Sequence, residues 1–193
     1  MKFILCHLLL LILGCTSSSQ YEHNEISTPS KNVKPLSPKD FMPLKIGYSL
    51  KYHVSYPGQE GIHIITIVKE KDGTFIDSTE NTFTIDSQGL HDQQRYLIKN
   101  PLTVGTKWYS VSGPSSVEHF SIIDIPDRCM VKSKAFDECL IIEGEVKLFG
   151  QGKFKTLWTY AKNIGIVEII TYLESGEGKK LKQSVLSLES YAF

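Results

Sequence analysis

The stretch IGYSLKYHVSYPG, residues Ile46–Gly58, carries the clearest fold signal in the chain. Its large apolar side chains occupy every second position: Tyr48, Leu50, Tyr52, Val54 and Tyr56. Because successive side chains of a strand point to opposite faces, this period of two predicts a strand with one apolar and one polar face. The Pro-Gly pair that ends the stretch favours a tight turn.

Strand signals continue along most of the remaining chain. A β-branched run covers 61–70, and Asp72-Gly73, a typical hairpin pair, precedes a further run at 74–85. Further strands are expected at 90–100, 107–111, 119–125, 128–132, 139–149, 153–161, 165–173 and 180–190. Short strands with turns between them predict an all-β fold, an antiparallel meander that curls into a half-barrel or open barrel. A β-sandwich of two sheets is the alternative.

Helical signals are sparse by comparison. No window of a dozen residues has the apolar spacing of an amphipathic helix. A single helical turn is expected at Ser37–Asp40, because serine can cap a helix and Pro38 can take its first position.

The N-terminus has the pattern of a secretory signal peptide. One charge, Lys2, precedes the apolar run Phe3–Leu13, which is much shorter than the roughly 20 residues that a helix needs to cross a bilayer. The segment Ile12–Cys15 resembles the lipobox of bacterial lipoproteins. The resemblance implies removal of residues 1–14 and acylation of Cys15, and several acyl chains together hold a protein stably on a membrane. An ordinary signal peptide with an unrelated cysteine is the alternative.

These signals divide the chain into three parts: a lipoprotein signal peptide at 1–14, a lipidated N-terminus with a flexible linker at 15–40, and an antiparallel β domain at 41–193. The linker is rich in Ser, Thr, Asn, Pro and charge and has few apolar residues, so it cannot offset its own ordering entropy. We expect an extracytoplasmic domain anchored to the cell membrane through Cys15. Thr16, the residue directly after this cysteine, resembles its counterpart in lipoproteins sent to the outer membrane of double-membraned bacteria.

Composition and cysteine count agree with an exported single domain. The chain has 193 residues, of which 41% are hydrophobic, and its 21 basic and 21 acidic residues give no basic excess for nucleic acid. Cys6 leaves with the signal peptide and Cys15 takes the lipid. The remaining pair, Cys129 and Cys139, suggests a disulfide, since oxidising compartments let such bonds persist. Two reduced, buried cysteines are the alternative.

Four short segments resemble an uncharacterised group of bacterial secreted proteins and lipoproteins. They are FMPLKIGYSLKYHV at 41–54, YLIKNPLTVGTKW at 96–108, AFDECLII at 135–142 and YAKNIGIVEII at 160–170. The last resembles the group's Tyr-Ala-x-x-Val-Gly-Leu-Val hairpin, with Ile164 and Ile166 in place of valine and leucine. The resemblance implies a β-rich extracytoplasmic domain and no particular activity.

The sequence contains no recognisable catalytic or cofactor motif. Nucleophile elbow, zinc-protease, phosphate-loop and dinucleotide patterns are all absent from it, so we expect no enzyme, no cofactor and no metal site. His53 and His63 would face each other on neighbouring strands if the turn after Tyr56 had an odd number of residues; two solvated histidines are the alternative. Trp108 and Trp158 are interpreted as core anchors.

Two functional hypotheses follow from this pattern. The first is a membrane-anchored, non-catalytic β domain that binds another envelope component through a surface or an edge strand. The alternative is a carrier or sensor of an apolar, lipid-like ligand held in the curved sheet. Whether the concave face of that sheet is filled or hollow distinguishes them best.

Overall fold

The computed structural model describes residues 35–113, 116–148 and 152–193, and Pro35–Phe193 forms one compact unit. This unit is all-β, as predicted, apart from one 3₁₀ turn, η1 (Pro38–Phe41). The predicted signal peptide, Cys15 and the predicted linker up to residue 34 lie outside the described residues. The strands are β1 (Ser49–Tyr56), β2 (Gln59–Lys71), β3 (Thr74–Asp77), β4 (Thr82–Ile85), β5 (Gly89–His91), β6 (Tyr96–Lys99), β7 (Lys107–Gly113), β8 (Ser116–Asp124), β9 (Arg128–Val131), β10 (Lys134–Asp137), β11 (Cys139–Lys147), β12 (Lys153–Ala161), β13 (Gly165–Glu174) and β14 (Lys180–Ala192).

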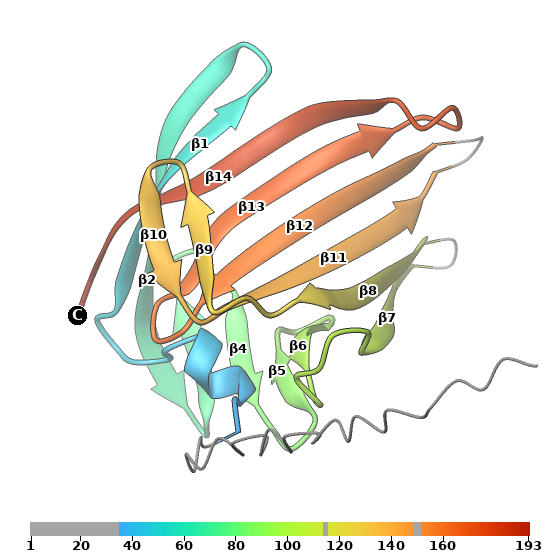
Figure 1. Cartoon of the computed structure of the whole chain (residues 1–193). Helices are drawn as coiled ribbons and strands as arrows, with labels where there is room; N and C mark the ends of the chain where they lie inside the picture. The colour runs from blue at the N-terminus through green and yellow to red at the C-terminus, as the bar shows by residue number, and fades with distance from the viewer. Residues whose placement is uncertain (1–34, 114–115, 149–151) are drawn as a thin grey trace, which may run out of the picture. The chain divides into compact units, whose positions relative to one another are not determined.

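Twelve of these strands form one antiparallel sheet that curls into a nearly closed barrel (Figure 1). Their order is β6-β5-β4-β3-β2-β1-β14-β13-β12-β11-β8-β7, and β9 and β10 form a separate hairpin. The barrel expectation is therefore right, and the alternative of two stacked sheets is not formed. The edge strands β6 and β7 come from neighbouring segments of the chain.

The predicted alternation of β1 decides which face of the sheet holds the core. Leu50, Tyr52 and Val54 are buried, whereas the residues between them are at least partly exposed. Tyr52 lies opposite Leu188 of β14, which is also buried. We call this core-bearing side the inner face and the opposite side the outer face.

Two tyrosines of the apolar stretch join the β1 region to the turn before β13 and to the first residues of β13. The Tyr48 hydroxyl donates to the Ile164 carbonyl at 2.6 Å, and the Tyr52 hydroxyl donates to the Ile166 carbonyl at 2.9 Å. Burial is the main reason that the pKa of both phenols lies well above its ordinary value. These buried donors are therefore satisfied, and they connect two strands that are not neighbours in the sheet.

The helical turn forms where it was expected, with one residue of offset. Ser37 precedes η1, and the Asp40 carboxylate accepts a hydrogen bond from the Ser37 amide at 2.8 Å. Pro38 takes the first helical position, where its missing N–H costs nothing. Phe41 at the end of the turn is fully buried, so η1 covers the core rather than extending into solvent.

The runs at 74–85 and 90–100 are each divided into two strands by an aspartate turn. One carboxylate oxygen of Asp77 accepts the amides of Thr79 and Asn81, at 2.8 and 3.0 Å. Asp92 accepts the amides of Gln94 and Arg95 in the same way, at 2.7 and 2.8 Å. Aspartate competes for local backbone amides and so ends a strand that apolar patterning alone would continue.

The expected disulfide between Cys129 and Cys139 is present and ties hairpin β9–β10 to the start of β11. Strand β10 was not predicted separately. Val131 and Phe136 of the hairpin are buried, and the Lys134 ammonium donates to the Glu189 carbonyl on β14. The hairpin therefore packs against the large sheet rather than projecting into solvent.

Candidate functional site

The inner face is filled where β7, β8 and β12 approach one another. The Trp108 and Phe120 rings stack with centroids 5.4 Å apart, and Phe120 lies 5.8 Å from Trp158. Gly144 makes room for this cluster, because a Cβ atom there would come within 2.6 Å of the Trp158 ring. Both tryptophans thus belong to the core, as the sequence pattern predicts.

Arg95 completes the aromatic cluster from the β5–β6 turn. Its guanidinium lies 5.7 Å from the centroids of both Phe120 and Trp158. It pairs with Glu118 on β8 and has Asp92 at 3.6 Å. Burial raises the pKa of the nearby Tyr160 phenol, and the Arg95 charge opposes that rise. The one guanidinium of this cluster is therefore already matched by carboxylates.

Side chains bridge the seam between the two edge strands. The Trp108 indole N–H donates to the Tyr96 carbonyl on β6 at 2.8 Å. The Ser110 hydroxyl donates to the Gln94 carbonyl at 3.1 Å, and Arg95 reaches Glu118 across the same gap. The two edges of the sheet are thus joined by side-chain contacts, so fewer backbone groups there are free to pair with an added strand.

Farther along the same strands, the inner face is open. Small residues come first: the Thr156 and Thr171 hydroxyls are 3.3 Å apart on β12 and β13. Beyond them lies a line of apolar side chains, which we call the concave row, paired in register across four neighbouring strands. Leu181 is 59% exposed and Phe154 is 38% exposed, although both point inward. The concave row consists of Val146, Phe154, Leu173 and Leu181.

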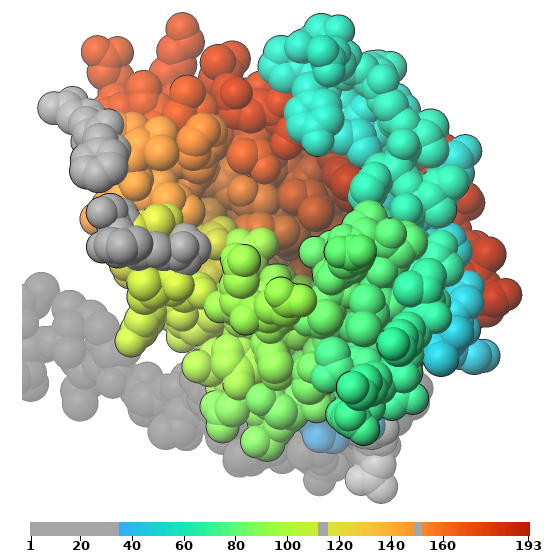
Figure 2. Space-filling model, turned by 180° about the vertical axis from the view of Figure 1, so that it is seen from behind, coloured from blue at the N-terminus to red at the C-terminus, as the bar shows by residue number. Residues whose placement is uncertain are grey.

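Figure 2 shows this side of the unit hollowed, with an orange-to-red floor of β12–β14 between the cyan β1–β2 hairpin and the yellow-to-green strands. Beside β1 a pocket of about 420 Å³ is lined by Val54, Tyr56, His63 and Leu186 among others. A Cβ atom added to Gly61 in its wall would meet no other atom within 4 Å. The concave face is therefore filled at one end and hollow at the other.

The hypothetical histidine pair is not formed. Tyr56 pairs with Gln59, so the turn contains only Pro57 and Gly58, an even number of residues. His53 consequently lies opposite Ile62 on the outer face, with its ring 3.4 Å from the Glu60 carboxylate. His63 lies opposite Tyr52 on the inner face. In the described part of the chain no three His, Cys, Asp or Glu residues are grouped as metal ligands.

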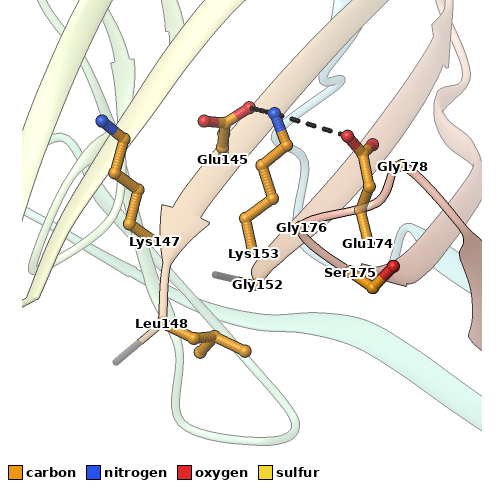
Figure 3. A pocket seen from close by; sticks show the side chains of 9 residues that line it. All are labelled: Glu145, Lys147, Leu148, Gly152, Lys153, Glu174, Ser175, Gly176 and Gly178. Atoms are coloured by element: carbon orange, nitrogen blue, oxygen red, sulfur yellow. Dashed lines mark ion pairs between the residues drawn. The ribbon is translucent and has the colours of Figure 1, made fainter. Parts of the chain in front are cut away.

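A second pocket, of about 370 Å³, lies on the outer face near the loops after β11 and β13 (Figure 3). Lys153 is 3.0 Å from Glu145 and 3.5 Å from Glu174. Burial alone would raise the pKa of Glu145, but the hydrogen bond and charge of Lys153 hold it below its usual range. Lys155 pairs with Glu143 at 3.2 Å in the next row. These charged side chains around the pocket are thus already paired with side chains of opposite charge.

The outer face also brings His53, Ser187 and Glu168 into one row across β1, β14 and β13. Burial raises the pKa of Glu168. Ser187 is only 1% exposed, and none of the hydrogen bonds found among the described residues joins it to His53. An activated serine needs a base within hydrogen-bond reach and access for a substrate, so this row lacks the geometry of a catalytic site.

Sequence reasoning did not anticipate the Arg95–Glu118 pair or the concave row. Arg95 and Glu118 are 23 positions apart and meet only because the sheet closes. The concave row looks like ordinary strand alternation in the sequence, and its exposure depends on what lies across the barrel. Over the described residues, no helix is long and apolar enough to span a membrane.

No family model and no curated protein matches the chain, whereas two solved structures are similar to it at low identity. A candidate exported protein with a YmcC-like fold from Bacteroides fragilis is 11% identical, with a TM-score of 0.42 over 79% of this chain and 99% of its own. A candidate lipoprotein from Parabacteroides distasonis is 10% identical, with a TM-score of 0.41 over 79% of this chain and 98% of its own.

Proposed function

We propose that this protein is an exported, membrane-anchored lipoprotein whose non-catalytic β domain binds another component of the cell envelope on its concave face. The observation that carries the proposal is the concave row, in which Leu181 and Phe154 point inward yet remain exposed. Inward-facing apolar side chains of a barrel are normally covered by the opposite wall, and leaving them in water forgoes about 25 cal/mol per Å² of apolar surface. A ligand that covers the row would recover this free energy.

The concave face is a better candidate than the edges or the outer face. An added strand would have to displace the side chains that bridge β6 and β7, among them Trp108 and Ser110. The outer face of β2 exposes Ile62 and Ile64, but these lie on a surface without walls. The pocket beside β1 instead has walls, and its volume of about 420 Å³ lies within the range of about 300–1,000 Å³ that is usual for ligand pockets.

The absence of catalysis is part of the proposal and is supported by the surroundings of Ser187 and His53. Ser187, which has a histidine and an acid beside it in the sheet, is 1% exposed. The His53 ring lies 3.4 Å from the Glu60 carboxylate rather than beside a nucleophile. These contacts favour a binding protein over a hydrolase.

The anchor is proposed at Cys15, after removal of residues 1–14, with the outer membrane as destination in a double-membraned cell. Metabolic labelling with an alkyne fatty acid tests this directly. We expect the full-length chain to be labelled and to fractionate with membranes, and Cys15→Ala to lose both properties. A labelled Cys15→Ala variant would refute the assigned anchor.

The binding face is tested by placing a photoreactive p-benzoylphenylalanine in the full chain in living bacteria. Position Phe154 lies on the concave row, and Tyr109, 70% exposed on the outer face of β7, is the matched control. We expect a light-dependent adduct from Phe154 and none from Tyr109. Adducts from Tyr109 alone, or from neither position, would overturn the proposal.

A further inference from the structure

We propose that the component bound on the concave face is a long acyl chain, which lies along the concave row and enters the pocket beside β1. This inference rests on the proposed function and adds the chemical class of the ligand. The row crosses four adjacent strands, which spans about 14 Å at the usual strand spacing of about 4.8 Å. A linear, flexible chain suits such a strip better than a compact ligand does.

The side chains of the row specify an apolar partner. Leu181, Leu173 and Val146 are aliphatic and Phe154 is aromatic, so the row offers neither a charge nor a hydrogen-bond donor. Sugars, by contrast, would require polar groups converging on the same surface. The hydroxyls of Thr156 and Thr171, which lie next to the row, are within hydrogen-bond distance of each other.

Charge complementarity leads to the same conclusion. Arg95 near the filled end of the concave face is paired with Glu118 and has Asp92 at 3.6 Å. An anionic ligand would have to displace these carboxylates, which contact the guanidinium at close range. An uncharged hydrocarbon chain meets no such competition, and any polar headgroup would remain toward solvent.

Strand β14 connects the row to the pocket. Leu181 ends the row, and Leu186 on the same strand lines the pocket. An irregularity in the β13–β14 register between Thr171 and Tyr172 places both leucines on the inner face in spite of their odd spacing. The open space at Gly61 leaves room for the end of a chain.

The test uses the full-length chain in bacteria grown with a diazirine-bearing C16 fatty acid, followed by illumination and mass spectrometry of the peptides. We expect light-dependent adducts on peptides from β12–β14. An adduct that also contains the Cys15 peptide would identify the protein's own lipid as the source, whereas an adduct with a free lipid mass would identify another envelope lipid. Either adduct supports the acyl chain.

Two pairs of variants make the test specific. Leu181→Lys places a charge on the concave row, and Ile64→Lys places the same charge on the outer face at a residue that is 54% exposed. Gly61→Leu adds a large apolar side chain to the pocket wall, and Ser55→Leu places the same side chain on the outer face of the neighbouring strand. We expect the two inner variants to reduce the yield of light-dependent adducts on β12–β14 about tenfold, equivalent to about 1.4 kcal/mol. The two outer variants should keep the wild-type yield.

The outcomes separate this inference from the proposed function. Equal yields of light-dependent adducts on β12–β14 in Leu181→Lys and Ile64→Lys would overturn the acyl-chain assignment. A protein or glycan adduct from p-benzoylphenylalanine at Phe154, without fatty-acid adducts on β12–β14, also overturns it but leaves the concave face as the binding surface. If neither probe reacts on the concave face, both proposals fail.

Discussion

Gly144 offers the sharpest test of how the barrel interior is packed. Replacing it with alanine adds a Cβ atom 2.6 and 2.7 Å from two carbons of the Trp158 ring, well inside van der Waals contact. The ring has little freedom to move away, because Phe120 packs against it and Arg95 lies 5.7 Å from its centroid. We therefore expect Gly144→Ala to strain the whole aromatic cluster.

The magnitude is set by two opposing effects. Overpacking a dense interior costs about 1–3 kcal/mol. Alanine in place of glycine at an ordinary backbone conformation gains about 0.4–1 kcal/mol by restricting the unfolded chain. The midpoints of these two ranges leave a net destabilisation of about 1.3 kcal/mol for Gly144→Ala, which lowers the melting temperature by about 3–5 °C in a chain of this length.

Gly61 is the matched control, since a Cβ atom there meets nothing within 4 Å and only the favourable effect remains. We expect Gly61→Ala to raise the melting temperature and Gly144→Ala to lower it. Thermal unfolding followed by fluorescence suits the experiment because the protein has only two tryptophans, Trp108 and Trp158. If Gly144→Ala melts as high as Gly61→Ala, the Trp158 ring is not held in place and the packing argument is wrong.

Three further predictions concern the disulfide, the seam between β6 and β7, and a partly buried acid. Replacing both Cys129 and Cys139 with alanine should lower the free energy of unfolding by about 3 kcal/mol in urea titrations, since the bridge closes a loop with a sequence separation of 10; an unchanged midpoint would contradict this. Trp108→Phe keeps an aromatic side chain but removes the indole N–H that donates to the Tyr96 carbonyl, so hydrogen exchange in β6 should accelerate; loss of the hydrogen bond alone costs about 0.5–1.5 kcal/mol. Unchanged protection would show that this bond does not hold the seam. Burial raises the pKa of Glu168 above its ordinary value of 4.5, so its ionisation destabilises the fold as the pH rises through that value. Glu168→Gln should therefore be more stable than wild type near neutral pH and lose this advantage below about pH 4, where the wild-type carboxyl is mostly protonated in both states. Equal stability of the two proteins near neutral pH would show that this partly buried charge costs nothing.

Local patterns in the sequence were sufficient to predict most strands. In β1 the alternation of tyrosine, leucine and valine with polar residues specified both the strand and its buried face, because the side-chain period of a strand is two. The cysteine count predicted the bridge between Cys129 and Cys139. The alternation depends only on neighbouring residues, and the bridge was inferred from the number of cysteines in a chain expected to be exported. Neither inference requires knowledge of the fold.

Features that depend on side-chain capture or on closure of the sheet could not be predicted in this way. Asp77 and Asp92 end strands by capturing local amides, an effect that apolar patterning does not register. The histidine hypothesis depended on the length of a single turn. The Arg95–Glu118 pair and the open concave row exist only because the sheet curls until β6 meets β7.

The pairing of β1 with β14 has a consequence for biogenesis. β1 is the first strand of the sheet to be synthesised and β14 is the last, yet the two are hydrogen-bonded neighbours. Contacts between such distant segments form late and slowly, because a long loop must be closed before they contribute stability. The barrel can close only when β14 is available to pair with β1, so closure of the sheet waits until its last strand has been made.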